Sequence, residues 1–174
     1  MMRSSTVTLI ALALLCGCAH YQVGYSGDPA LNTIRIGRIH NTTDEPGLNA
    51  WLRGEFAAGF MRDGSMSVVN DSAADCILNA TITDYKLHQI GQIETASNDR
   101  DQRLARTVIW AVDVQIEYTI ERADGSIYIE NTTAKGRAEF SEVIDLDVVR
   151  KDGLRQAVYD AAGQVVANTT APPW

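Results

Sequence analysis

Cys18 is the residue whose type and surroundings most clearly predict a covalent reaction. It closes the segment Leu15-Cys16-Gly17-Cys18, in which an apolar residue, a tolerant position and a small residue precede the cysteine. This order is typical of the bacterial lipobox, where the small residue lets a signal peptidase reach the bond before the cysteine, and the thiol receives a diacylglyceryl group. We therefore expect cleavage between Gly17 and Cys18 and acylation of Cys18, with palmitate as an acyl group.

The residues before Cys18 have the composition of a signal peptide. Arg3 supplies a positive start, the stretch from Val7 to Leu15 is almost wholly apolar, and no acidic residue precedes Asp28. The run is too short for a bilayer core, which takes about 20 residues, and it has the length of a signal-peptide apolar region. The alternative is an ordinary secretory signal followed by a chance cysteine.

Three segments are expected along the chain: residues 1–17 as a removed signal peptide, residues 18–32 as the lipidated cysteine with its tether, and residues 33–170 as a single α+β domain. Several acyl chains hold a protein durably at a membrane, because each buried methylene contributes about 0.8 kcal/mol. Ala19 stands where an aspartate typically retains lipoproteins in the inner membrane. We therefore expect a lipid-anchored protein of the outer membrane, in a bacterium with two membranes.

Arginines concentrate in the polar connection expected over residues 91–106. Arg100, Arg103 and Arg106 fall within seven residues, and Lys135 lies on a later strand. Guanidinium groups bind phosphate in bidentate fashion, so these four residues are candidates for contacts with an anionic ligand. The alternative is a solvated loop, in which neighbouring aspartates partly neutralise the arginines.

Other chemistry has little support in the sequence. No nucleophile-elbow, P-loop, zinc-protease, EF-hand or paired-cysteine motif occurs, and the three histidines have no second ligand at metal spacing. We therefore expect no catalytic residue, no metal and no cofactor, and we expect the protein not to be an enzyme. Once Cys16 leaves with the signal peptide and Cys18 carries lipid, Cys76 is the remaining thiol, so no intrachain disulfide is expected.

Composition is that of an acidic globular protein. The 174 residues include 15 basic and 22 acidic side chains, and removal of residues 1–17 takes away only Arg3, which changes the net charge from −7 to −8. A hydrophobic content of 45% argues against disorder. An acidic chain lacks the basic footprint that nucleic acids require, so nucleic acid is excluded as a partner.

Hydrophobic periodicity predicts strands and two helices. Between Arg106 and Glu121, apolar and polar residues alternate, which indicates a half-buried strand, and Asp124-Gly125 is a hairpin turn signal. The expected fold is α+β: a four-stranded mixed or antiparallel sheet with two helices packed on one face. The expected strands are 33–40, 75–89, 106–121 and 126–140, with 67–69 as a further short strand outside that count, and the helices run from about 45 to 63 and from 146 to 168.

Three segments resemble those of the LPS-assembly lipoprotein (LptE) family. They are Tyr21-Gln22-Val23-Gly24 after the lipidated cysteine, the run Asn41-Thr42-Thr43-Asp44-Glu45-Pro46-Gly47-Leu48, and the strand from Ala73 to Tyr85 that opens with Ala-Asp. The resemblance runs from the lipobox to about Tyr85, and beyond that point only the order of strands and helices agrees.

The resemblance implies an outer-membrane lipoprotein that plugs the LptD β-barrel and helps to insert lipopolysaccharide. The partners would be LptD, lipopolysaccharide and the membrane, and Arg100, Arg103, Arg106 and Lys135 would contact lipopolysaccharide phosphates or acidic groups inside the barrel. An alternative class is a lipoprotein that activates a penicillin-binding protein, or a related curli-secretion lipoprotein. The identity of the partner distinguishes the two.

Overall fold

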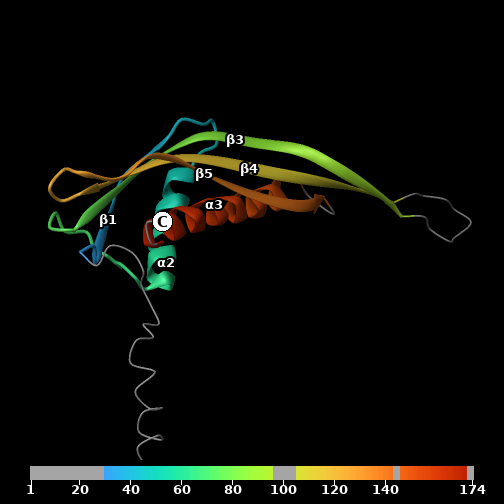
Figure 1. The fold of residues 1–174 in the computed structure, drawn as a ribbon. Helices are drawn as coiled ribbons and strands as arrows, with labels where there is room; N and C mark the ends of the chain where they lie inside the picture. The colour runs from blue at the N-terminus through green and yellow to red at the C-terminus, as the bar shows by residue number, and fades with distance from the viewer. Residues whose placement is uncertain (1–29, 96–104, 143–145, 172–174) are drawn as a thin grey trace, which may run out of the picture.

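A curved sheet wraps around one layer of two helices (Figure 1). The structure is a computed structural model that describes residues 30–95, 105–142 and 146–171. In chain order the elements are β1 (Thr33–Asn41), α2 (Leu48–Asp63), β2 (Ser67–Val68), β3 (Cys76–Thr95), β4 (Ala105–Arg122), β5 (Ile127–Glu142) and α3 (Leu146–Thr170).

The sheet has five strands in the order β2-β1-β3-β4-β5. Strand β1 is parallel to both β2 and β3, whereas β3, β4 and β5 are antiparallel. The predicted α+β class is confirmed, but the predicted count of four strands is wrong. The short segment at Ser67–Val68 joins the sheet because Ser67 N donates to Asn32 O at 2.8 Å and Val69 N donates to Ile34 O at 3.0 Å.

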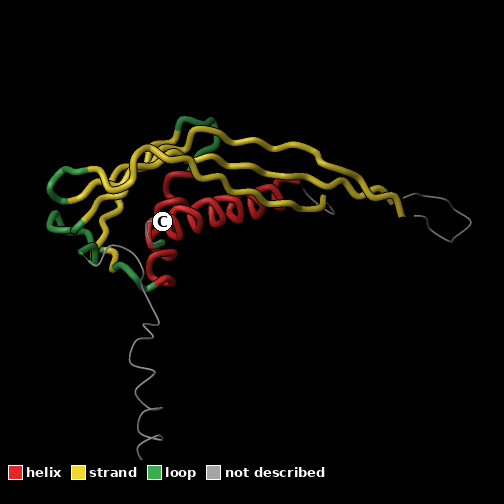
Figure 2. The backbone as a smooth tube through the Cα atoms, in the orientation of Figure 1, coloured by secondary structure: helices red, strands yellow, loops and turns green. Residues whose placement is uncertain are grey.

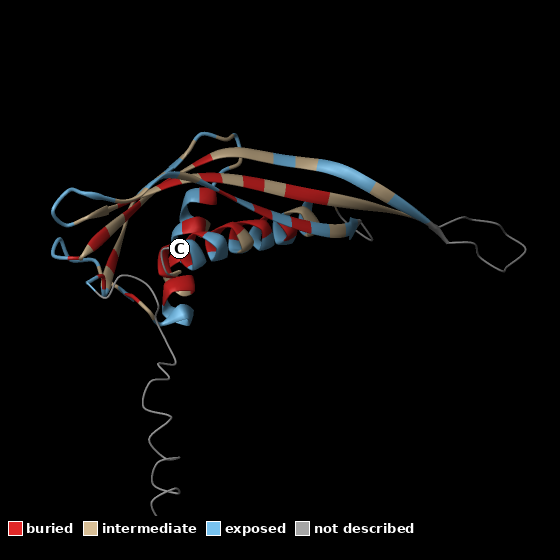
Figure 3. Ribbon diagram, in the orientation of Figure 1, coloured by how far each residue is buried: buried red, intermediate tan, exposed pale blue. Residues whose placement is uncertain are grey.

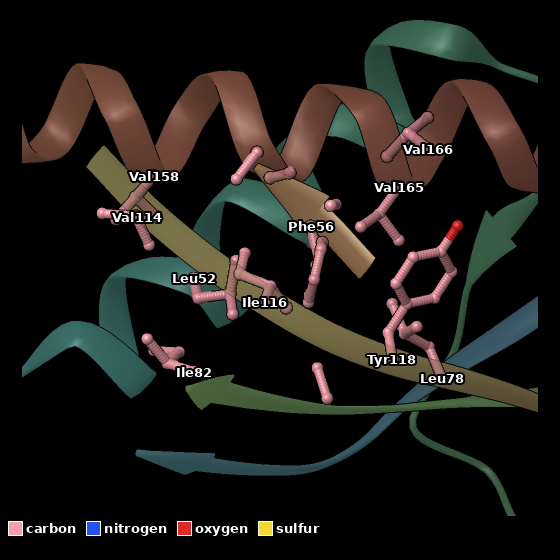
Figure 4. Close-up of a cluster of buried hydrophobic side chains, with 14 of the residues drawn as sticks. Leu52, Phe56, Leu78, Ile82, Val114, Ile116, Tyr118, Val158, Val165 and Val166 are labelled. Carbon is pink, nitrogen blue, oxygen red and sulfur yellow. The ribbon is translucent and has the colours of Figure 1, made fainter. Parts of the chain in front are cut away.

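The alternation in β4 decides which face of the sheet is buried. Alternate residues from Val112 to Ile120 are at most 1% exposed and point toward the helices. Figure 4 shows three of them, Val114, Ile116 and Tyr118, against side chains of α2 and α3, and Figure 3 shows the buried and less buried positions alternating along the strand. The core-facing residues of β4 are Val112, Val114, Ile116, Tyr118 and Ile120, as the period-two pattern predicted.

Strands β3 and β4 extend further than predicted. Their pairing continues to Thr95 opposite Ala105, so the ladder reaches into the connection expected over residues 91–106. The pairing of β3 with β4 shifts register twice, between Ile82 and Asp84 and between Gln89 and Gly91. After each shift, odd-numbered and even-numbered residues of β3 exchange the faces of the sheet toward which they point. Because a bulge exchanges the faces of all later residues, the alternation of the full strand is interrupted. The paired ends form a two-stranded arm beyond the helices (Figure 2).

Helix α3 packs along β5 and covers its free edge. Gln164 Nε2 donates to Lys135 O at 2.6 Å, Lys135 N donates to Gln164 Oε1 at 3.3 Å, and Arg137 N donates to Asp160 Oδ2 at 3.2 Å. These bonds occupy main-chain groups that an edge strand would otherwise offer to another chain. Helix α3 ends at Thr170, two residues beyond the predicted end. Neither described helix combines the length and the apolarity needed to cross a membrane.

Candidate functional site

The connection from β1 to α2 is folded by the side chain of Asn41. Its Nδ2 donates to Glu45 O at 2.8 Å, and its Oδ1 accepts from Thr43 N at 3.0 Å and from Thr43 Oγ1 at 2.8 Å. The helix starts only at Leu48, after Gly47 at φ 82°, and no side chain caps it. Helix α2 therefore begins later than the predicted start at about residue 45, because Asn41 holds the residues that follow it in a turn of their own.

Glu45 joins this turn to the start of α3. Arg150 Nη1 lies 2.7 Å from Glu45 Oε2 and donates to Tyr85 Oη at 3.2 Å. These two contacts, with the tyrosine the larger cause, raise the pKa of Arg150. The arginine and the glutamate are 105 residues apart, so no local pattern predicted the pair. Arg150 therefore ties α3 to β3 and to the β1–α2 turn.

Asp75 makes a second tie, between the starts of β1 and β3. Its Oδ2 accepts from Thr33 Oγ1 and Thr33 N at 2.8 Å each and from Asn32 N at 2.9 Å. These bonds, first the one from the Thr33 hydroxyl, hold the pKa of the Asp75 carboxyl below its usual range. Asn41, Glu45 and Asp75 belong to the segments that resemble the LptE family, and in this structure they stabilise the fold.

The outer face of the sheet, turned away from the helices, carries a network of charges on its three long strands. Asp113 of β4 lies 3.6 Å from Arg137 Nη1 of β5 and 3.6 Å from His88 Nδ1 of β3, and Arg137 also lies 3.1 Å from Glu139. Lys86 Nζ lies 2.8 Å from Asp84 Oδ2. This face is polar and charge-paired, so it can lie against an aqueous, polar wall.

A groove of about 680 Å³ continues this outer face at β1. The walls include Arg35, Arg38 and His40 from β1 and Glu117 from β4. Sequence reasoning treated His40 as an isolated residue and did not single out the two arginines. Gly37 lies between the two arginines. An isolated glycine inside a strand indicates a bulge or a close approach of another group to the backbone, and this signal could have located the groove.

The structure describes two of the four candidate ligand residues, Arg106 and Lys135, and these two lie far apart. Arg100 and Arg103 lie outside the described residues, as does Cys18. Arg106 lies in β4 rather than in a loop, and its side chain is also outside the described part. Lys135 is exposed on β5 and pairs with Gln115 of β4. Gln115 and Arg106 are nine residues apart in β4, which is about 30 Å along an extended strand. Lys135 instead borders a hollow of about 420 Å³ that Lys86, Asp113 and Arg137 also line.

Cys76 is a buried free thiol at the start of β3. Its Sγ donates to Thr33 O at 3.6 Å. Burial, and secondarily the charge of Asp75, raise the pKa of Cys76 to about 12. A thiolate is the reactive form of cysteine, so this side chain packs as an inert apolar group.

We expect the thiol of Cys76 in the folded protein to resist modification by a disulfide reagent, and reductant to leave Tm unchanged. The reason is that the thiol is buried and stays protonated near neutral pH. A chromogenic thiol assay measures the first and a thermal melt the second. The denatured protein, in which the same thiol is accessible, is the positive control. Rapid modification of the folded protein would contradict the burial.

No family model matches this sequence, and no curated protein matches it. Three of the solved structures that share its fold illustrate the likeness. A protein from Xanthomonas campestris has a TM-score of 0.51 at 11% identity over 86% of this chain and 92% of its own. A minor lipoprotein from Acinetobacter baumannii has a TM-score of 0.50 at 13% identity, over 80% and 92% of the two chains. A hypothetical protein from Chlamydia trachomatis has a TM-score of 0.50 at 7% identity, over 80% and 93%.

Proposed function

We propose that this chain is an outer-membrane lipoprotein of envelope assembly, a partner of the LptD β-barrel in lipopolysaccharide transport. The observation that carries the proposal is the lipobox-like segment ending at Cys18, placed ahead of segments that resemble the LptE family. The fold supports it, because the Acinetobacter baumannii protein that shares this fold is named a minor lipoprotein.

The outer face of the sheet suits a plug inside a barrel. Barrel interiors are polar, and this face presents paired charges on β3, β4 and β5, among them Lys86, Asp113 and Arg137. A lipid on Cys18 holds the domain beside the membrane through a short tether, which raises its effective concentration near a membrane-embedded partner. The chain acts in this proposal as a binding and assembly protein, without catalysis.

The proposed role of Arg100, Arg103 and Arg106 is to contact lipopolysaccharide phosphates at the far end of the β3–β4 arm. The arm supports this role because its two paired strands extend beyond the helices (Figure 2), and Arg106 belongs to it, opposite Glu94. Lys135 belongs to a different part of the outer face, so we place it against the wall of the barrel instead.

The test uses the full chain with a C-terminal affinity tag, expressed in its own host. We expect intact-mass spectrometry to show a mature protein that starts at an acylated Cys18, and a pull-down from detergent-solubilised outer membrane to recover a large β-barrel protein. Cys18→Ser is the matched control, because it removes the acceptor thiol and leaves the domain unchanged. An unmodified Cys18 in the wild-type protein would refute the anchor.

Depletion of the protein distinguishes the two classes of envelope lipoprotein. We expect surface lipopolysaccharide to fall while peptidoglycan synthesis continues. Normal lipopolysaccharide export with failing peptidoglycan synthesis would instead assign the protein to the activators of penicillin-binding proteins.

A further inference from the structure

The groove at β1 is built around the missing side chain of Gly37. A Cβ at this position would collide with Asn79 Oδ1 and would lie 2.8 Å from Ile77 Cγ2. The glycine therefore lets the Asn79 amide lie over β1, where its Oδ1 accepts from Arg38 N at 2.9 Å. The register between β1 and β3 shifts at this point, between Ile36 and Ile39. The result is a hollow in the outer face, lined by Arg35 and Arg38, which lie before and after Gly37 in β1.

The charge in this groove is unbalanced. Arg35, Arg38 and His40 line it together with a single carboxylate, that of Glu117. Within the part of the chain that the structure describes, neither arginine side chain forms an ion pair. In contrast, Arg137 and Arg150 are each paired with carboxylates.

Arg35 has a further unused donor. Its Nε is buried and has no hydrogen-bond partner among the described residues. Buried polar atoms are almost always satisfied in folded proteins, so a shift of the Arg35 side chain toward an acceptor in the groove would satisfy a donor that has no partner. A guanidinium group presents its donors in a planar fork that fits the oxygens of a phosphate.

The rest of the lining suits a hydroxyl-bearing ligand. Asn79, Asn131, Thr81 and Thr119 contribute amides and hydroxyls, and Asn131 Nδ2 donates to Glu117 Oε2 at 3.5 Å. Such groups both donate and accept, as the hydroxyls of a sugar require. The volume of about 680 Å³ is within the range of small-molecule sites, about 300–1,000 Å³.

We propose that this groove binds a phosphorylated sugar, with the phosphate at Arg35 and Arg38 and the sugar hydroxyls toward Asn79 and Asn131. A phosphate monoester carries a charge of about −1.5 to −2 near pH 7, opposite in sign to the excess positive charge of the groove. The site goes beyond the proposed function and does not depend on it, because it lies on β1, β3 and β4 and uses none of the arginines of residues 100–106.

The test compares two double variants that remove the same charge. Arg35→Gln with Arg38→Gln empties the groove of its guanidinium groups, while Lys86→Gln with Lys151→Gln removes two exposed charges outside it. The probes are glucose 1-phosphate, inorganic phosphate and glucose, measured by calorimetry at low salt.

We expect the wild-type protein and the lysine variant to bind glucose 1-phosphate alike, and the arginine variant to bind it at least about tenfold more weakly, because charge-assisted hydrogen bonds are lost. Inorganic phosphate and glucose should each bind the wild-type protein more weakly than the sugar phosphate. The amide signals of Asn79 and Asn131 should shift on titration.

Three outcomes would overturn the proposal. The first is unchanged binding of glucose 1-phosphate by the arginine variant. The second is an equal loss of affinity in the lysine variant, which would show that long-range charge alone accounts for binding. The third is an equal affinity of the wild-type protein for inorganic phosphate, which would show that the groove does not recognise the sugar. Arg38 is exposed, so the single variant Arg38→Gln keeps the test valid if the double variant fails to fold.

Discussion

Replacing Val114 by aspartate is expected to prevent the domain from folding. Val114 is 1% exposed and belongs to the same apolar cluster as Leu52 and Val158, which Figure 4 shows from α2 and α3. A carboxylate there must either lose its hydration without a partner or take up a proton, and both are costly. We expect the free energy of unfolding to fall by more than about 4 kcal/mol, which is a large part of the about 5–15 kcal/mol by which native domains are stable.

Ile93→Asp is the matched control for this substitution. It also places aspartate at an apolar strand position, but Ile93 is 54% exposed and pairs with Thr107 in register. Its effect on the free energy of unfolding should stay within about 0.5 kcal/mol. Circular dichroism and urea unfolding measure both variants. Equal stability of the two would mean that the core-facing side of β4 has been misassigned.

Elements with one buried face were predictable from the sequence. In β4 the apolar residues from Val112 to Ile120 alternate without interruption, and a register error would expose all of them, so pattern and structure agree. In β3 the bulges near Thr83 and Ile90 break the pattern, and the strand continues to Thr95 where the sequence indicates a polar loop. Strand β2 has only two residues, too few for any period to identify its place in the sheet.

The polar contacts were less predictable, because they depend on how the elements pack. Arg150 meets Glu45 only after α3 has packed across the sheet. Arg35, Arg38 and Asn79 come together because β1 and β3 pair in parallel around Gly37. Lys135 and Arg106 were grouped by charge, yet the register of β4 and β5 separates them along the strand. Charge type is visible in a sequence, whereas proximity depends on strand register.

Replacing Gly136 by alanine is expected to push α3 away from β5. A Cβ on Gly136 would collide with Ala157 O and lie 2.5 Å from Ala161 N, both of which are backbone atoms of the helix. No side-chain rotation relieves a collision with backbone, so the helix itself must move. Overpacking of this kind costs about 1–3 kcal/mol, and we expect a loss at or above the upper end.

Gly163→Ala separates this collision from the general effect of adding a methyl group. Gly163 is an exposed residue of the same helix, and nothing lies within 4 Å of its Cβ position, so alanine there should stabilise the protein by about 0.5–1 kcal/mol. Hydrogen exchange gives an independent readout, because the amides of Lys135 and Arg137 are protected by Gln164 and Asp160 of α3. These two amides should exchange faster in Gly136→Ala and at the wild-type rate in Gly163→Ala. If both alanine variants raised Tm, α3 would not approach β5 as closely as the structure places it.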